Sequence, residues 1–152
     1  MLKWKYQANH TLLNEPPVKI YSHRRLFPDT YLGRIETNGK VYEKRTGPDK
    51  YIGRVNEDGK VYETRLGPDK YIGHVDPDSG KVYEKRVGPD RYMGRVNEDG
   101  TIYHHKRLAP DQYLGKVTDM QSLVHAGAAF LLLVLPVFAE ELADFEQGQE
   151  AE

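Results

Sequence analysis

The sequence predicts an all-β protein: a closed ring, or shallow barrel, of about five β-hairpins with ten short antiparallel strands and one C-terminal apolar α-helix. Three observations predict it. A repeat of about 20 residues fills the middle of the chain, each repeat holds two strand-like runs around a turn signal, and a long apolar segment follows the last repeat. Because a ring of this size needs a filling, we expect the helix to be threaded through it.

The repeat is defined by the pattern tyrosine, any residue, glycine, a basic residue and an aliphatic residue. It begins at Tyr31, Tyr51, Tyr71, Tyr92 and Tyr113, and each tyrosine follows a Pro-Asp pair and one further residue. Within the repeats, Asn38-Gly39, Asp58-Gly59 and Asp99-Gly100 are typical of two-residue type I′ turns, because these residue types accept a positive φ. Each repeat is therefore expected to form a β-hairpin.

A two-residue turn at Asp58-Gly59 would place Val55 opposite Tyr62 and Arg54 opposite Glu63. Since strand side chains alternate between the two faces, the motif tyrosine, glycine and valine would then line the ring, and the basic residue would face outward. The glycines would let a helix approach the sheet closely. The predicted ring-lining residues are Tyr31, Gly33, Tyr51, Gly53, Tyr71, Gly73, Tyr92, Gly94, Tyr113 and Gly115.

The ends of the array predict how the ring closes. Residues 113–117 supply only the first strand of a repeat, whereas residues 20–25 supply only the second. Pairing these halves would make a fifth hairpin from both ends and leave no free sheet edge. We therefore divide the chain into an N-terminal extension (1–17), the hairpin ring (18–117), an apolar helix with a proline kink (118–146) and an acidic disordered tail (147–152).

The apolar segment 123–139 is open to two interpretations. At ~1.5 Å per residue a helix of this length spans roughly 26 Å, just short of the usual membrane-spanning length. It is either a plug inside the ring or a membrane anchor, and Pro136 is expected to kink or end its first stretch. The predicted plug residues are Phe130, Leu131, Leu133, Val134 and Phe138.

Charge is unevenly distributed although the formal net charge is −1. The repeats carry 20 Lys/Arg against 15 Asp/Glu, whereas residues 118–152 carry seven acidic residues and no Lys or Arg. There is no cysteine, which excludes disulfides and thiolate metal sites, and the first ten residues lack the apolar run of a signal peptide. We expect a cytoplasmic protein, with association with membranes as an open alternative.

The repeated Tyr-x-Gly-Arg-Val…Asp-Gly-Lys-Val-Tyr hairpin followed by an apolar helix resembles the β-flower family over roughly residues 18–139. That resemblance implies a shallow symmetric barrel of hairpin petals and no particular chemistry. The outline is also similar to tubby-like barrels, which enclose an apolar helix and bind phosphoinositide headgroups. A role at lipid surfaces follows from this similarity of shape alone, since no lipid-binding motif of that family can be matched here.

No catalytic, cofactor or metal site is recognisable, and we expect a non-enzymatic protein. His104 and His105 are adjacent on a strand and point to opposite faces, and the aspartates after each proline are expected to bond their own turn backbone. The outward bases Arg34, Arg54, Arg95 and Lys116 are a candidate surface for an anionic partner, or else cross-strand partners of Glu43, Glu63 and Glu84.

The leading functional hypothesis is a binding or scaffold module that associates with anionic lipid or membrane surfaces. A soluble module that binds another protein, with its helix permanently buried, is the alternative. Weak nucleic-acid binding ranks third, because a small excess of positive charge and an acidic tail do not favour it. The sequence does not indicate an oligomeric state.

Overall fold

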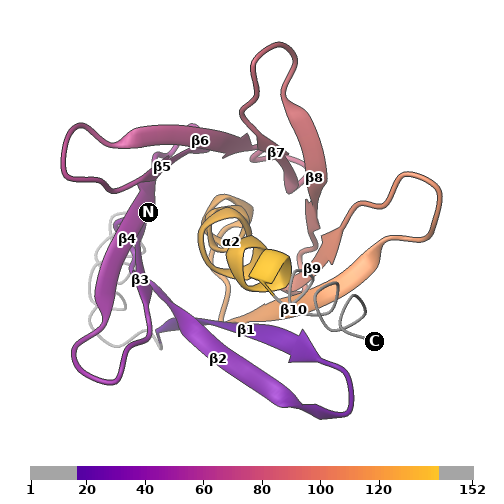
Figure 1. Cartoon of the computed structure of the whole chain (residues 1–152), viewed down its shortest axis with the longest axis horizontal. Helices are drawn as coiled ribbons and strands as arrows, with labels where there is room; N and C mark the ends of the chain where they lie inside the picture. Colours follow the sequence, from indigo (N-terminus) through magenta and orange to yellow (C-terminus); the bar gives the residue numbers. More distant parts are fainter. Residues whose placement is uncertain (1–16, 141–152) are drawn as a thin grey trace, which may run out of the picture.

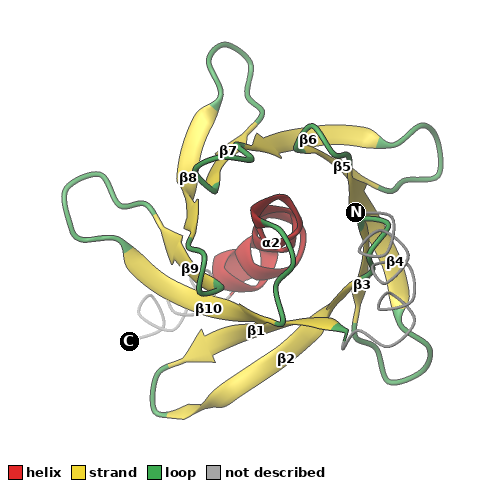
Figure 2. Ribbon diagram, turned by 180° about the vertical axis from the view of Figure 1, so that it is seen from behind, coloured by secondary structure: helices red, strands yellow, loops and turns green. Residues whose placement is uncertain are grey.

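The computed structural model describes residues 17–140 as a closed antiparallel barrel surrounding one helix (Figures 1 and 2). The strands are β1 (Val18–Arg24), β2 (Phe27–Ile35), β3 (Lys40–Glu43), β4 (Lys50–Val55), β5 (Lys60–Glu63), β6 (Lys70–Val75), β7 (Lys81–Glu84), β8 (Arg91–Val96), β9 (Thr101–His104) and β10 (Gln112–Thr118). The helix comprises α2 (Leu123–Ala129), the π-helical segment η1 (Phe130–Val134) and a last stretch that runs to Glu140. The predicted fold class is confirmed. The predicted acidic tail, 147–152, lies outside the described residues, as does almost all of the N-terminal extension.

The barrel closes through its own ends. Consecutive strands pair around the ring, and β1 pairs antiparallel with β10, with Ile20 opposite Val117 and Tyr21 opposite Lys116. No strand therefore has a free edge, and the predicted closure through the two ends of the array is confirmed. We call the junction of β1 and β10 the seam.

Five hairpins spread outward from the barrel in Figure 1, and we call them petals: β1–β2, β3–β4, β5–β6, β7–β8 and β9–β10. Their tips are residues 25–29, 45–49, 65–69, 86–90 and 107–111. Shorter turns after β2, β4, β6 and β8 join one petal to the next. The barrel thus has a petal end, where the tips lie, and a turn end, where the short turns lie.

The short turns are one residue longer than predicted. In the turn after β4, Val55 pairs with Val61, and the Asn56 N–H donates to the Lys60 carbonyl at 2.9 Å. Gly59 has φ +95°, but Asp58 does not have a positive φ, so this is not a type I′ turn. It is a three-residue turn that ends in a left-handed glycine. The predicted register is wrong by one residue, and Arg54 faces Tyr62 rather than Glu63.

This shift, together with a bulge, reverses part of the predicted lining of the ring. A one-residue change of register moves Val61 to the inside and Tyr62 to the outside. On β4, Tyr51 lies opposite Tyr42 while Gly53 lies opposite Val41, so Ile52 is an extra, bulged residue. The bulge turns the motif tyrosine outward. The prediction that Tyr31, Tyr51, Tyr71, Tyr92 and Tyr113 line the ring is therefore wrong, and buried valines and isoleucines line it instead.

The motif glycines are buried, as expected, and their main neighbour is the next strand. A Cβ at Gly53 would fall on the backbone carbonyl oxygen of Tyr62, and Gly33, Gly73, Gly94 and Gly115 stand in the same relation to the equivalent tyrosines. At Gly53 the added Cβ would also lie 2.9 Å from Leu132, on the helix. The glycines therefore permit two close approaches, first of the neighbouring strand and then of the helix.

The helix lies within the ring of strands, and its middle is fully enclosed (Figure 2). Ser122 caps its start by accepting a hydrogen bond from the His125 N–H at 3.1 Å. The segments α2 and η1 contact strands on opposite sides of the barrel, including β2, β4, β6 and β8 for α2. Among the predicted plug residues, Phe130, Leu131, Leu133 and Val134 are buried in the core, and Phe138 is half-buried and contacts the ring of His104.

The helix does not end at Pro136 but continues to Glu140. Instead, the turn before the proline widens into the π-helix, in which the Leu135 N–H donates to the Phe130 carbonyl. Because proline cannot donate to the carbonyl one turn earlier, a π-bulge at this point is a common accommodation. Residues 123–140 are long and apolar enough to cross a membrane by length and composition, but just over half of that stretch is buried inside the protein.

The close approach at the motif glycines gives a direct test. We expect Gly53→Ala to destabilise the protein by about 2 kcal/mol or more, because the new methyl group meets a backbone oxygen that cannot move without breaking the β4–β5 ladder. Chemical denaturation followed by circular dichroism measures the change.

The matched control is Gly67→Ala, at a petal tip where an added Cβ meets nothing within 4 Å. That variant should be neutral or slightly stabilising, because alanine restricts the unfolded chain more than glycine does. Equal effects of the two substitutions would show that the close approach does not limit position 53.

Candidate functional site

A belt of paired tyrosines runs around the outer face of the barrel. Each petal contributes one pair, with ring centroids 5.5–5.6 Å apart and the rings tilted. The pairs are Tyr21–Tyr31, Tyr42–Tyr51, Tyr62–Tyr71, Tyr83–Tyr92 and Tyr103–Tyr113. Burial raises the pKa of Tyr31, Tyr71, Tyr92 and Tyr113, so these hydroxyls stay protonated. The belt packs as a cross-strand aromatic ladder.

The basic residue of each motif lies over a tyrosine of the next petal. The guanidinium carbon of Arg34 is 4.1 Å from the ring centre of Tyr42, and that of Arg54 is 4.3 Å from Tyr62. Arg95 and Lys116 make longer contacts of the same kind, and His74 stacks on Tyr83 with an interplanar angle of 11°. These contacts join each petal to its neighbour.

The same basic residues also bind the aspartate of the next petal. The closest atoms are 3.3 Å apart for Arg34–Asp49 and 3.0 Å for Arg54–Asp69. The remaining pairs are His74–Asp90, Arg95–Asp111 and, across the seam, Lys116–Asp29. The series is cyclic, so each petal is fastened to the next around the whole ring. Arg34, Arg54, Arg95 and Lys116 are therefore engaged within the protein.

The predicted partners of these bases are wrong, because the change of register moves the glutamates to the inner face. Glu43, Glu63 and Glu84 instead pair with the arginine two residues further along the chain, just beyond the end of the strand: Arg45, Arg65 and Arg86, at 2.8, 3.5 and 2.7 Å. The aspartates after each proline bind the basic residues of the motif, which we call the belt bases. Asp29, Asp69 and Asp111 also contact His23, Thr64 and His105 of their own petals. Aspartates that bond the turn backbone are found instead in the short turns. Asp58 accepts a hydrogen bond from the Lys60 N–H, and Asp99 accepts one from the Thr101 N–H.

Pockets open between the petals and the last turns of the helix, at the petal end. One, of about 540 Å³, lies between the β5–β6 and β7–β8 petals and is lined by Lys70, Lys85 and Arg86 together with Glu63 and Glu84. Two smaller pockets, of about 260 and 280 Å³, contain Glu43 and a lysine. In each of these three pockets carboxylates accompany the bases, so none of the three has a purely basic lining.

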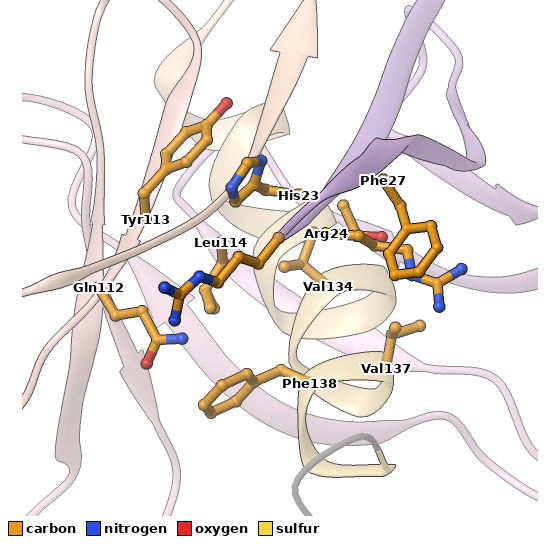
Figure 3. Close-up of a pocket in the computed structure, with 11 residues that line it drawn as sticks. His23, Arg24, Phe27, Gln112, Tyr113, Leu114, Val134, Val137 and Phe138 are labelled. Atoms are coloured by element: carbon orange, nitrogen blue, oxygen red, sulfur yellow. The ribbon is translucent and has the colours of Figure 1, made fainter.

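A fourth pocket, of about 400 Å³, lies at the seam and has a different lining (Figure 3). Gln112 and Tyr113 of β10 lie on one side of its opening and Phe27 of β2 on the other, with Val134 and Phe138 of the helix between them. Its remaining lining residues are Ser22, His23, Arg24, Arg25, Leu114 and Val137. None of its lining residues is acidic. We call it the seam pocket.

The petal tips expose large apolar side chains that the sequence analysis did not single out. They are Leu26, Phe27, Leu66, Val87 and Leu108, all more than 60% exposed. Each tip also carries an arginine directly before its leucine or valine: Arg25, Arg65, Arg86 and Arg107. A signal was available, because an apolar residue recurs at the one place in each repeat where turn residues should be polar. In the β3–β4 petal this position is Thr46.

Two histidines are partly withdrawn from solvent. Burial lowers the pKa of His125, in the first turn of the helix, and its Nδ1 atom has no hydrogen-bond partner in the described part of the chain. Burial also lowers the pKa of His104, whose Nδ1 lies 3.0 Å from the Met93 carbonyl oxygen. Both side chains are therefore held in the neutral form.

Within residues 17–140, no three His, Asp or Glu side chains lie close enough together to hold a metal ion. Comparison of the chain with protein-family models, with curated proteins and with solved structures finds no match. The functional argument therefore starts from the geometry at the petal end.

The inter-petal contact can be improved at the position where the basic residue of the motif is a histidine. We expect His74→Arg to stabilise the protein by about 0.5 kcal/mol at pH 8, because arginine keeps its charge and can copy the Arg54 contacts with tyrosine and aspartate. Arg54→His should destabilise by a similar amount. Thermal unfolding measures both changes, and a loss of stability in His74→Arg would contradict a shared geometry in these petals.

The histidines predict a pH dependence. In the unfolded chain a histidine takes up its proton near pH 6.5, whereas burial keeps His125 neutral to lower pH in the folded protein. The free energy of unfolding should therefore fall as the pH is lowered through 6.5, because the unfolded state binds more protons.

His125→Leu should make this pH dependence shallower, as measured by urea unfolding at several pH values. His23→Leu, at an exposed position of β1, is the control and should leave the fall below pH 6.5 in place. An identical pH dependence in His125→Leu and the natural protein would show that His125 takes up its proton equally in both states.

Proposed function

We propose that this protein is a non-enzymatic module that binds the surface of anionic membranes through its petal end. The observation that carries the proposal is the set of exposed apolar side chains at four of the five petal tips, each next to an arginine. Soluble proteins rarely expose large apolar groups without a function, and five at the loop tips of one barrel need an explanation.

Apolar and basic residues at one tip suit the membrane interface. Leucine, valine and phenylalanine can enter the boundary between headgroups and acyl chains, and full burial of such a side chain contributes about 1.5–3 kcal/mol. The neighbouring arginines stay at the headgroup level, where attraction to an anionic surface contributes about 1 kcal/mol per charge. Several weak tips acting together would give useful affinity through multivalency.

The petal end of the barrel is more basic than the turn end, as binding of the petal end to an anionic membrane requires. The petal segments 22–30, 43–50, 63–70, 84–91 and 104–112 hold twelve Lys/Arg and eight Asp/Glu, and one aspartate in each is already paired with a belt base. The short turns 36–40, 56–60, 76–81 and 97–101 hold seven acidic residues and three lysines. An anionic surface would attract the petal end and repel the turn end.

The exposed end of the helix belongs to the same face. Val87, at one tip, shares a pocket with Leu135, Pro136 and Ala139, and Phe27, at another, shares the seam pocket with Val137 and Phe138. The petal end thus combines an apolar centre with apolar, arginine-bearing tips around it. Because the rest of the helix packs in the barrel core, we propose binding to the surface rather than insertion of the whole helix.

The resemblance of the repeat to the β-flower family, and of the outline to tubby-like barrels, supports the same proposal. We propose membership of the β-flower family on the repeat motif. We also propose a cytoplasmic location, because anionic lipids are concentrated in the cytoplasmic leaflet. A soluble module that binds a protein through its tips is the competing hypothesis.

Vesicle flotation tests the proposal. The full chain should float with vesicles of phosphatidylcholine and phosphatidylserine, and not with phosphatidylcholine alone. Leu66→Asp combined with Val87→Asp should lower the partition coefficient about tenfold or more, because two inserting side chains are replaced by charges that the anionic surface repels.

The matched control is Thr37→Asp combined with Ser79→Asp, which adds the same charge at exposed positions of the turn end. It should float like the natural protein. If the tip variant also floats normally, or if the natural protein stays in the soluble fraction with both lipids, membrane binding by the petal end is wrong and protein binding becomes the favoured hypothesis.

A further inference from the structure

The seam pocket lies where the repeat departs from its own pattern. Each motif glycine pairs with one residue on the first strand of the next petal. That residue is Glu43, Glu63 or Glu84 in three petals. It is His104 in the β9–β10 petal and Ser22 in the β1–β2 petal. The two exceptions are consecutive around the ring. Acidic side chains are therefore missing from the inner face where the last petal meets the first.

The two arginines at the seam pocket have no carboxylate to balance them, whereas His23 pairs with Asp29 at 3.2 Å. Arg24 and Arg25 line the pocket with His23 and Gln112, and neither arginine forms an ion pair with any residue of the described range 17–140. The guanidinium of Arg24 lies 5.1 Å from the ring centre of Phe27. At the position of Arg25 in the other petals, Arg45, Arg65 and Arg86 are paired with glutamate, and Arg107 forms no ion pair within residues 17–140.

Ser22 supplies an independent indication of a ligand. Its side chain is 5% exposed and lines the pocket, and its Oγ atom has no hydrogen-bond partner among the described residues. Burying a hydroxyl without a partner is unfavourable. A hydrogen-bonding group placed between Ser22 and the arginines would satisfy it.

Apolar side chains also line the pocket, from β2, β10 and the helix. They are Phe27, Leu114, Val134, Val137 and Phe138, and the last three belong to the helix. A volume of about 400 Å³ lies within the range of small-molecule sites and can hold a medium-length alkyl chain. The pocket thus combines basic and polar groups with apolar side chains.

We propose that the seam pocket binds a single-chain anionic amphiphile, with its carboxylate or phosphate headgroup on Arg24, Arg25 and Ser22 and its alkyl chain against the helix. Planar guanidinium groups suit the oxygens of both headgroups. A free fatty acid and a monoalkyl phosphate share this chemistry. The site needs no membrane, so the proposal goes beyond the proposed docking of the petal tips.

Isothermal titration calorimetry with the full chain and without vesicles tests the proposal, at amphiphile concentrations below micelle formation. Dodecanoate and dodecyl phosphate should each bind in the micromolar range, as is usual for ligands of this size. Dodecanol, which lacks the charge, and inorganic phosphate, which lacks the chain, should bind at least about tenfold more weakly. The comparison of dodecanoate with dodecyl phosphate identifies the preferred headgroup.

Matched variants assign the site. Arg24→Ala combined with Arg25→Ala should weaken dodecanoate binding about tenfold or more and leave dodecanol binding unchanged. Arg45→Ala combined with Arg86→Ala removes two arginines from other petals, where glutamate already pairs with them, and should change neither. Ser22→Ala should weaken dodecanoate binding several-fold without lowering the melting temperature, because the lost hydroxyl has no partner within the protein.

The proposal is overturned if no amphiphile binds below micelle formation, if dodecanol binds as tightly as dodecanoate, or if both arginine pairs behave alike. Equal affinity for inorganic phosphate would also overturn it, in favour of a simple anion site. Leu66→Asp with Val87→Asp, which removes the tips used for vesicles, should bind dodecanoate normally. Loss of vesicle binding and loss of ligand binding are therefore separable.

Discussion

The architecture depends on a steric constraint that recurs in every petal: the absence of a side chain at the motif glycine. With only a hydrogen there, the carbonyl of the neighbouring tyrosine can come against the strand, and the residue before the glycine can bulge inward. The bulge turns one tyrosine outward to meet its partner and sends an aliphatic residue toward the core. The inner wall, the outer belt and the fit of the helix all follow from this local geometry.

Much of the architecture is predictable from the sequence because it depends on periodicity. The spacing of the tyrosines, the incomplete repeats at both ends and the single apolar segment are long-range signals, and they predict a closed ring with one helix correctly. The faces of the strands depend on one residue of register, and a turn of three residues looks almost the same in sequence as one of two. Val61 and Tyr62 therefore exchange faces relative to the prediction.

The candidate sites were harder to predict for related reasons. Arg34 and Arg54 are conspicuous in the repeat, yet they fasten neighbouring petals together. Informative residues are those that depart from the repeat. Ser22 draws attention only when the alignment of strands shows that glutamates occupy its equivalents, and that alignment needs the correct register. The exposed tips, such as Leu66, could have been found from sequence, because an apolar residue in a predicted turn is unusual.

Closure at the seam has a consequence for how the chain reaches its native state. Ile20 and Val117 become neighbours although nearly the whole ring separates them in sequence, whereas every other strand pair joins close neighbours in the chain. The petals can form one by one as local hairpins. Closing the ring is the one step that carries a large loss of loop entropy. The helix lies after the last strand, so on the ribosome the interior of the barrel has no filling until the helix has been made. Premature release or a lost final strand would leave two sheet edges and an apolar wall exposed together, which are the conditions under which β-proteins aggregate.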